Sequence, residues 1–215
     1  VMVKQMSPER LRRAIRYAVA RHSAYRTESI YHRDDLTQLP NFSAFQKGLA
    51  DALSDARKIK DYQVGVMHLG VDGIKLINNG LGKGAGDELL VSIARRLLTT
   101  LRDRDVVSRK EGDEFTILLK GSGIHDTIDI IADRVLKIFS MPFVIADEEV
   151  YSSACIGISL TDGAQDAAEL IQDADIALQK SKRKGRGSKE IFLRTMQQDA
   201  RKRLQLENDL RRSLA

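Results

Sequence analysis

Apolar residues recur along this chain in two patterns, a spacing of three or four positions and short unbroken runs. The first pattern covers 42–53 and predicts an amphipathic helix, introduced by the turn-forming pair Pro40-Asn41. The second covers Tyr62 to Val71, which has the length of a buried central strand and stops at glycine-containing polar sequence. Further along, the same patterns predict a helix over 87–101, strands over 106–109 and 115–119 around a turn at Gly112, a helix over 127–139, strands over 143–146 and 150–160, a helix over 167–183 and a last strand over 190–193.

The order of these elements after the entry helix is βαββαββαβ. Hairpins mixed with helical crossovers favour an α/β sandwich, in which helices flank a mixed, largely antiparallel sheet. The length of 215 residues and a 42% hydrophobic content suit one such domain with extensions.

Charged amphipathic helices are predicted at both ends of the chain. The first follows a helix-start signal at Ser7-Pro8-Glu9 and continues to about Arg33, and the second covers 195–214. We therefore expect three parts: a signalling or linker helix over 1–33, a globular domain over 34–193 and a linker helix over 194–215.

Composition excludes several classes of protein. Much of the excess positive charge behind the net charge of +5 lies in the two charged ends, and only 5% of residues are aromatic, so we expect no nucleic-acid partner. No apolar stretch is long enough to cross a membrane and no signal-peptide pattern is present at the N-terminus, so we expect a cytoplasmic protein with no membrane partner. The single cysteine, Cys155, lies in an apolar run and is expected in the core.

Three polar segments have the composition of a phosphate site. They are the strand end Gly70-Val71-Asp72, a glycine-rich loop expected over 75–87, and the turn over 110–115. Carboxylate oxygens suit Mg²⁺, and glycine lets backbone N–H groups approach a phosphate. A flexible loop without a ligand explains the glycines equally well.

A series of ordered motifs resembles the GGDEF domain family. The series runs through Asp35-Leu36-Thr37-Gln38-Leu39-Pro40-Asn41, Asp72, Lys75, Ile77-Asn78, Gly82, Gly86-Asp87, Arg109 and Gly112-Asp113-Glu114-Phe115. The match extends over about 34–192. Each motif alone is weak evidence for the family, but the shared order of all the motifs is strong evidence. The resemblance implies a domain that binds GTP with Mg²⁺ or Mn²⁺ and pairs with a second copy to form cyclic di-GMP, a reaction in which each 3′-hydroxyl attacks the partner's α-phosphate.

The resemblance also assigns roles to individual residues. Asn78 and Asp87 correspond to the pair that reads guanine, and Lys75, Lys182 and Arg186 to residues that contact the GTP phosphates. Asp113 corresponds to the catalytic and metal-binding carboxylate, and Glu114 to the second acidic position of the signature.

Two departures from the family pattern weaken the expected activity. Gly70 stands where the family has a metal-binding aspartate, which leaves Asp113, the backbone carbonyl of Val71 and the nearby Asp72 as candidate ligands. Glu111 replaces the first glycine of the signature and adds a negative charge near the phosphates. Metal binding is therefore expected to be weakened or lost.

A second motif resembles the inhibitory site at which this family binds cyclic di-GMP. Arg102 and Asp105 form an Arg-x-x-Asp pattern five residues before the signature, and Arg134 corresponds to a secondary arginine. Arginine binds phosphate and guanine edges through a planar fork, although a surface ion pair explains the pattern as well.

Three functions remain open at this point. The leading hypothesis is a degenerate GGDEF domain that binds GTP, cyclic di-GMP or both, and regulates receiver-type and EAL-type domains of the same chain. The alternatives are an active diguanylate cyclase working as a homodimer, and a structural dimerisation spacer that binds no nucleotide.

Overall fold

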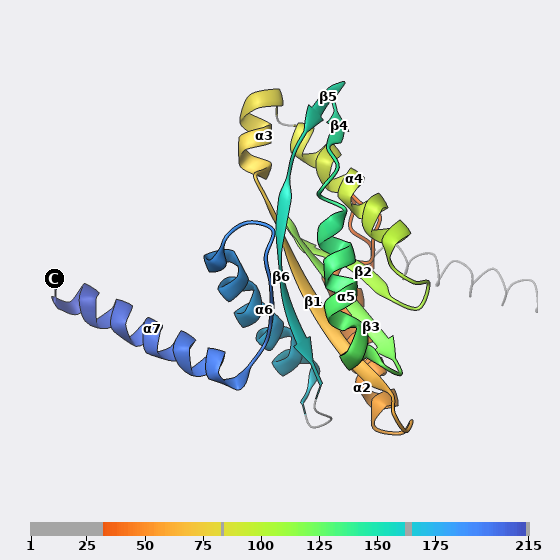
Figure 1. The fold of residues 1–215 in the computed structure, drawn as a ribbon, viewed down its shortest axis with the longest axis vertical. Helices are drawn as coiled ribbons and strands as arrows, with labels where there is room; N and C mark the ends of the chain where they lie inside the picture. Colours follow the sequence, from red (N-terminus) through yellow and green to blue (C-terminus); the bar gives the residue numbers. More distant parts are fainter. Residues whose placement is uncertain (1–31, 83, 162–164, 214–215) are drawn as a thin grey trace, which may run out of the picture. The chain divides into compact units, whose positions relative to one another are not determined.

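The computed structural model describes residues 32–213, apart from residue 83 and residues 162–164 (Figure 1). The helix predicted from Ser7 onward lies outside the described residues. Residues 34–215 form one compact unit. The position of this unit relative to residues 1–33 is not described.

A five-stranded sheet with the order β2-β3-β1-β6-β7 forms the centre of the domain. β1 (Gln63–Asp72) is the central strand and pairs antiparallel with both β3 (Glu114–Gly121) and β6 (Ser153–Leu160). At the two edges, β2 (Val106–Glu111) pairs antiparallel with β3, and β7 (Lys189–Ile191) pairs parallel with β6. The expected mixed, largely antiparallel sheet flanked by helices is confirmed.

Helices cover both faces of this sheet (Figure 1). Alternate residues of β1 point to opposite faces, so Val64 and Val66 pack with α2 (Phe42–Ala56) and α6 (Ala167–Lys184). Met67 and Leu69 pack on the other face with α4 (Ala85–Thr100) and α5 (Ile124–Lys137). Asn41 begins α2 as predicted, because its side chain accepts a hydrogen bond from the backbone N–H of Ala44 at 3.0 Å.

The segment expected as a glycine-rich loop is instead largely helical. Residues Ile74–Leu81 form α3, and only a short link separates it from α4. The expectation of a loop was wrong because Ile74, Ile77 and Leu81 recur at helical spacing and pack against the core, which outweighs the turn tendency of the glycines.

The expected strand over 150–160 is two strands. β5 (Glu148–Val150) pairs only with β4 (Phe143–Ile145), and β6 begins after a break of two residues. The β4–β5 hairpin turns through Ala146 and Asp147, both at positive φ (49° and 65°), as in a two-residue hairpin turn. Only Ser152 and Ser153 interrupt the apolar run near this break, and the pattern did not reveal the change of pairing partner.

Helix α6 lies very close to the sheet. A Cβ built on Gly157 of β6 would be 2.1 Å from the carbonyl oxygen of Ala174 and 2.1 Å from the backbone nitrogen of Leu178. Only glycine permits this approach. The contact fixes the depth at which α6 sits and therefore the position of residues one turn after Leu178.

Candidate functional site

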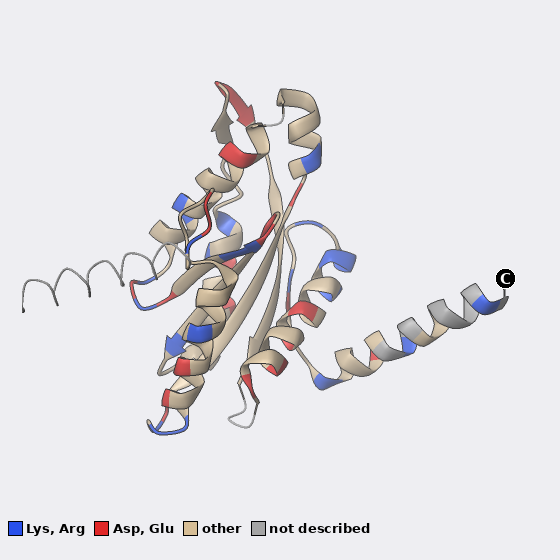
Figure 2. Ribbon diagram, turned by 180° about the vertical axis from the view of Figure 1, so that it is seen from behind, with Lys and Arg blue, Asp and Glu red and all other residues tan. Residues whose placement is uncertain are grey.

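The β2–β3 turn contains the signature residues, and basic and acidic segments meet there (Figure 2). Arg109 holds this turn, because its Nε and Nη2 donate to the carbonyl oxygen of Gly112 at 3.1 and 2.7 Å. Gly112 has a φ of 53°, which a side chain would disfavour. Glu111 and Gly112 are exposed at the tip, and Asp113 is half-buried behind them.

The motif over 34–41 supports the turn from the side. Asp34 accepts hydrogen bonds from Thr37 at its backbone N–H (2.8 Å) and its hydroxyl (2.7 Å), and from Nη1 of Arg109 (3.1 Å). Burial on its own raises the pKa of Asp34, but these hydrogen bonds and the Arg109 charge hold it below its ordinary value. The motif therefore positions the signature turn through Arg109.

Asn78 and Asp87 line one cavity together with Lys75, Arg109 and Asp113. Its volume is about 380 Å³. The Asn78 Oδ1 accepts a hydrogen bond from the backbone N–H of Gly86 at 2.8 Å and so caps the start of α4, while Asp87 is exposed in the first turn of that helix. Gly112 and Asp113 of the signature turn line the same cavity as these two polar side chains. Glu111 lies outside this lining.

A second cavity, of about 360 Å³, lies on the other side of the start of α3. It contains Asp72 and Arg186. The Asp72 carboxylate accepts a hydrogen bond from the hydroxyl of Ser153 at 2.7 Å. Asp72 and Asp113 therefore line different cavities, and the structure does not bring them into one ligand set.

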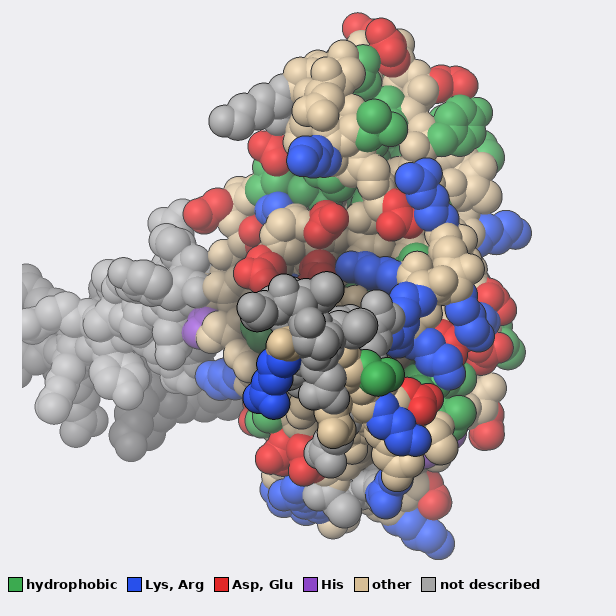
Figure 3. Space-filling view, turned by 90° about the vertical axis from the view of Figure 1, so that its left-hand side faces the viewer, with side chains coloured by type: hydrophobic (Ala, Val, Ile, Leu, Met, Phe, Trp, Pro, Cys, Tyr) green, Lys and Arg blue, Asp and Glu red, His purple; other side chains and the backbone are tan. Residues whose placement is uncertain are grey.

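Lys182 lies over the end of β1. A Cβ built on Gly70 would be 2.7 Å from its Cε and 2.9 Å from its Nζ. This position follows from the close packing of α6, since Lys182 comes one helical turn after Leu178. The α3 and α6 face of the molecule gathers Lys and Arg side chains next to acidic ones (Figure 3).

A cluster of charged groups lies behind the turn and beside Lys182. The Oε2 of Glu114 is 3.0 Å from Nε2 of His68 and 3.4 Å from Nζ of Lys110, and its Oε1 is 3.7 Å from Nζ of Lys182. The Nδ1 of His68 also contacts Asp175 of α6. The hydrogen bond from His68, together with the nearby lysines, lowers the pKa of Glu114 to about 2.

His68 is almost fully buried at 2% exposure, yet it is charged more readily than a free histidine. Burial lowers its pKa, but the hydrogen bonds to Asp175 and Glu114 outweigh burial and raise the pKa above 6.5. Sequence analysis did not identify His68, Lys110 or Asp175. The available signal was a histidine at an inward position of an otherwise apolar strand, which calls for a buried partner.

The residues of the predicted inhibitory site lie away from both cavities. Arg102 and Asp105 form a tight turn between α4 and β2, in which Asp105 Oδ2 accepts from the Arg102 backbone N–H at 3.1 Å. The Arg102 side chain is exposed. Arg134 is exposed in the last turn of α5.

Comparison with known proteins identifies the domain. The family model described as "Diguanylate cyclase, GGDEF domain" matches residues 31–188. The chain belongs to the GGDEF domain family. GGDEF domains generally use Mg²⁺, bind GTP and cyclic di-GMP and act as dimers.

Curated and structural relatives agree with this assignment. Diguanylate cyclase TpbB of Pseudomonas aeruginosa is 39% identical over 74% of this chain and 37% of its own length. The bifunctional diguanylate cyclase/cyclic di-GMP phosphodiesterase MucR of the same organism is 35% identical over 84% of this chain and 26% of its own length. A solved structure comprising only the GGDEF domain of TpbB has a TM-score of 0.75 and 37% identity, and the match covers 79% of this chain and 99% of that one. The chain thus spans well under half the length of these curated relatives.

The side chains of this GGDEF domain fit a divalent metal poorly. Gly70 offers no carboxylate, Asp72 is turned to Ser153, and Glu114 is surrounded by cationic groups. Within the described part of the chain, no three His, Cys, Asp or Glu side chains come together in a way that could hold a metal ion. In the same part, no helix is long and apolar enough to span a membrane.

Proposed function

We propose that this GGDEF domain is a regulatory module of cyclic di-GMP signalling that binds a guanine nucleotide and has weak or no cyclase activity. The cavity lined by Asn78, Asp87 and Asp113 supports nucleotide binding. A carboxylate accepts from the N1 and N2 groups of guanine, and an amide both donates and accepts. Lys75 at the same cavity supplies a positive charge for phosphates.

The observation that supports weak or no cyclase activity is the position of Lys182 in the space beside Gly70. Phosphoryl transfer depends on cations placed at the reacting phosphate, and a carboxylate at position 70 would help to hold one. In this chain a lysine side chain fills that space. Of the two carboxylates that the family pattern places at the metal, at positions 70 and 113, this chain has only Asp113. The backbone carbonyl of Val71 is a further candidate ligand, and Mg²⁺ binding is expected to be weak.

Binding of GTP by the purified chain tests nucleotide recognition. We expect Asp87→Ala to weaken binding tenfold or more in calorimetry, because the guanine edge loses its acceptor. Glu88→Ala is the matched control, since Glu88 is also exposed in the first turn of α4 and its removal changes the charge equally. Equal affinities of both variants and the unaltered chain would contradict guanine reading at this cavity.

Turnover distinguishes the regulatory module from the active enzyme. We expect no cyclic di-GMP above a blank when the chain is incubated with GTP and Mg²⁺ or Mn²⁺, even at concentrations that favour dimers. Steady production of cyclic di-GMP, abolished by Asp113→Asn, would instead show that this chain is an active diguanylate cyclase, the activity for which its relative TpbB is named.

Cyclic di-GMP is the second proposed ligand, bound at Arg102 and Asp105 with Arg134. The exposed Arg102 guanidinium supports this site. We expect Arg102→Ala to lower cyclic di-GMP affinity tenfold or more, whereas Arg104→Ala, an exposed charge in the same turn, leaves it within about twofold. A chain that binds neither nucleotide would be a structural spacer.

The partners proposed for this module are receiver-type and EAL-type domains of the same protein and a second copy of the domain. The relative MucR is named as a bifunctional diguanylate cyclase/cyclic di-GMP phosphodiesterase, and this supports an EAL-type neighbour. Dimerisation of the chain in analytical ultracentrifugation, with and without cyclic di-GMP, tests the homodimer.

A further inference from the structure

Lys182 lies against Gly70, the residue that stands where the family pattern has a metal-binding aspartate. Its Nζ is 2.9 Å and its Cε 2.7 Å from a Cβ built on Gly70, so any side chain at position 70 would displace the lysine. The position of Lys182 therefore depends on residue 70 having no side chain. The lysine side chain is 35% exposed, which leaves its ammonium accessible from outside.

The charges around Lys182 only partly neutralise it. Glu114 is its nearest carboxylate at 3.7 Å, but that carboxylate is also 3.0 Å from His68 and 3.4 Å from Lys110. Its negative charge is therefore shared among three cationic groups, two of which, His68 and Lys110, also pair with Asp175. A phosphate would still be attracted to this place, because three cationic groups face two carboxylates there.

The carboxylate donors near this point do not assemble around a cation. Asp113 lines the guanine cavity, whereas Asp72 lines the neighbouring one and accepts from Ser153. A divalent ion placed beside Gly70 would lie next to the ammonium of Lys182 and would be repelled by it. These charges favour an anion over a divalent cation at this place.

We infer that Lys182 takes the place of the divalent cation, so that this domain binds the phosphates of a guanine nucleotide without metal. Lysine is a compact point charge with three donors, which suits the terminal oxygens of a phosphate chain. The inference rests on the proposed function, because it concerns the phosphates of the guanine nucleotide proposed for the cavity of Asn78 and Asp87.

Affinity for GTP in two buffers tests the inference on the unaltered chain. We expect dissociation constants in EDTA and in millimolar Mg²⁺ to agree within about threefold. Binding that is tenfold or more tighter with Mg²⁺ would overturn metal-free binding while leaving the proposed function in place. Absence of binding in both buffers would overturn the proposed function and the inference together.

Two substitutions then test Lys182 itself. Lys182→Met should weaken binding in EDTA tenfold or more. Lys180→Met is the matched control on the same helix, since Lys180 pairs with Glu190 at 3.6 Å, and it should stay within about twofold. Equal loss in both variants would show a general effect of charge and would overturn the role of Lys182.

Gly70→Asp provides the reverse test. The new carboxylate should pair with Lys182, weaken binding in EDTA and make binding depend on Mg²⁺. Circular dichroism would establish that the variant is folded. A folded Gly70→Asp variant that binds GTP equally well in both buffers would contradict the inference, and the Lys182→Met comparison decides the question if the variant does not fold.

Discussion

Arg109 links two motifs that are far apart in the sequence. Its guanidinium contacts Asp34 at 3.1 Å and the Gly112 carbonyl at 2.7 Å, and its side chain is only 12% exposed. The planar fork of arginine can serve both partners at once, which a lysine cannot do. The shape of the signature turn therefore depends on a residue outside it.

Replacing Arg109 by lysine should destabilise the domain. Hydrogen bonds to charged groups each contribute about 1.5–3 kcal/mol, and lysine would retain only part of them, so we expect a loss of about 1–3 kcal/mol in urea unfolding. Arg95→Lys, at an exposed position of α4, should change the free energy of unfolding by less than about 0.5 kcal/mol. Equal stability of the two variants would contradict the proposed clamp.

His68 should make stability depend on pH. Because its folded pKa is raised above 6.5, the folded state binds the proton more tightly than the unfolded state. The resulting stability is fully present below about pH 6.5 and is lost as the pH rises through the folded pKa, with a slope of up to about 1.4 kcal/mol per pH unit.

Urea unfolding at pH values from 6 to 9 measures this slope. We expect His68→Gln to remove the fall in stability with rising pH that the unaltered chain shows. His125→Gln, at an exposed position of α5, should leave the slope unchanged. A slope that survives in His68→Gln would assign the pH dependence to another group.

The approach of α6 to β6 at Gly157 is the contact between elements that places Lys182. A Cβ there would meet backbone atoms at 2.1 Å, so Gly157→Ala requires the helix to move. We expect a loss of about 1–3 kcal/mol or more in urea unfolding. Gly48→Ala should instead raise the free energy of unfolding. Its Cβ would only touch Leu118 at 3.8 Å, and alanine favours the α2 helix by up to about 1 kcal/mol. Destabilisation of similar size in both variants would contradict the close packing.

Local patterns predicted the elements better than the contacts between them. The buried strand β1 and the long helices were predicted because each has a regular apolar period. Helix α3 was missed because its apolar residues stand among glycines, and the β5–β6 break was missed because pairing partners leave no trace in the pattern of side chains.

At the site, residues that belong to a sequence motif were predicted, and residues outside any motif were not. Asn78, Asp87 and Asp113 were identified from the family pattern and line one cavity. The contacts of Glu114 with His68 and Lys110 involve residues of no recognised motif, and only the three-dimensional register brings them together. The close approach of Lys182 to Gly70 likewise depends on how deeply α6 packs.

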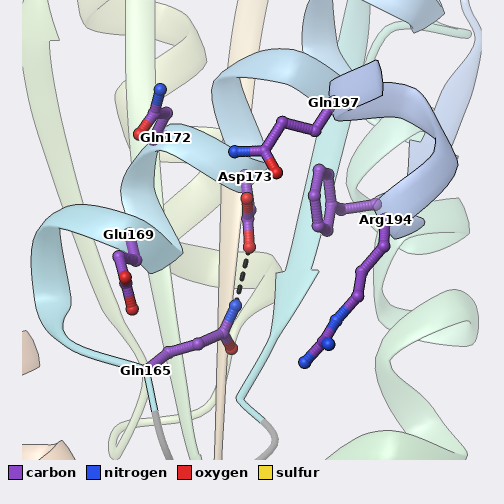
Figure 4. Close-up of a pocket in the computed structure, with 7 residues that line it drawn as sticks. Gln165, Glu169, Gln172, Asp173, Arg194 and Gln197 are labelled. Carbon is purple, nitrogen blue, oxygen red and sulfur yellow. Dashed lines mark hydrogen bonds between the residues drawn. The ribbon is translucent and has the colours of Figure 1, made fainter. Parts of the chain in front are cut away.

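At the scale of the whole domain, α7 (Arg194–Ser213) follows β7 and starts beside the N-terminal part of α6, far along that helix from Lys182. A cavity of about 290 Å³ lies where it starts, lined by residues of α6 and of the segment over 192–197 (Figure 4). Within it, Gln165 Nε2 donates to Asp173 Oδ2 at 2.7 Å. Met196 is 4% exposed and anchors the first turn of α7 to the domain.

We expect the burial of Met196 to determine how firmly the first turn of α7 is held to the domain. Met196→Ala removes buried apolar surface, and a loss of about 2–3 kcal/mol at this contact should release the start of α7 while the sheet stays folded. We expect faster proteolysis near residues 192–200 with an unchanged urea midpoint for the core. Gln198→Ala, exposed two residues later, should leave proteolysis unchanged. If Met196→Ala is cleaved no faster than this control, α7 is not held by Met196, and coupling between the nucleotide site and a following domain would have to run through β7 and the loop before it.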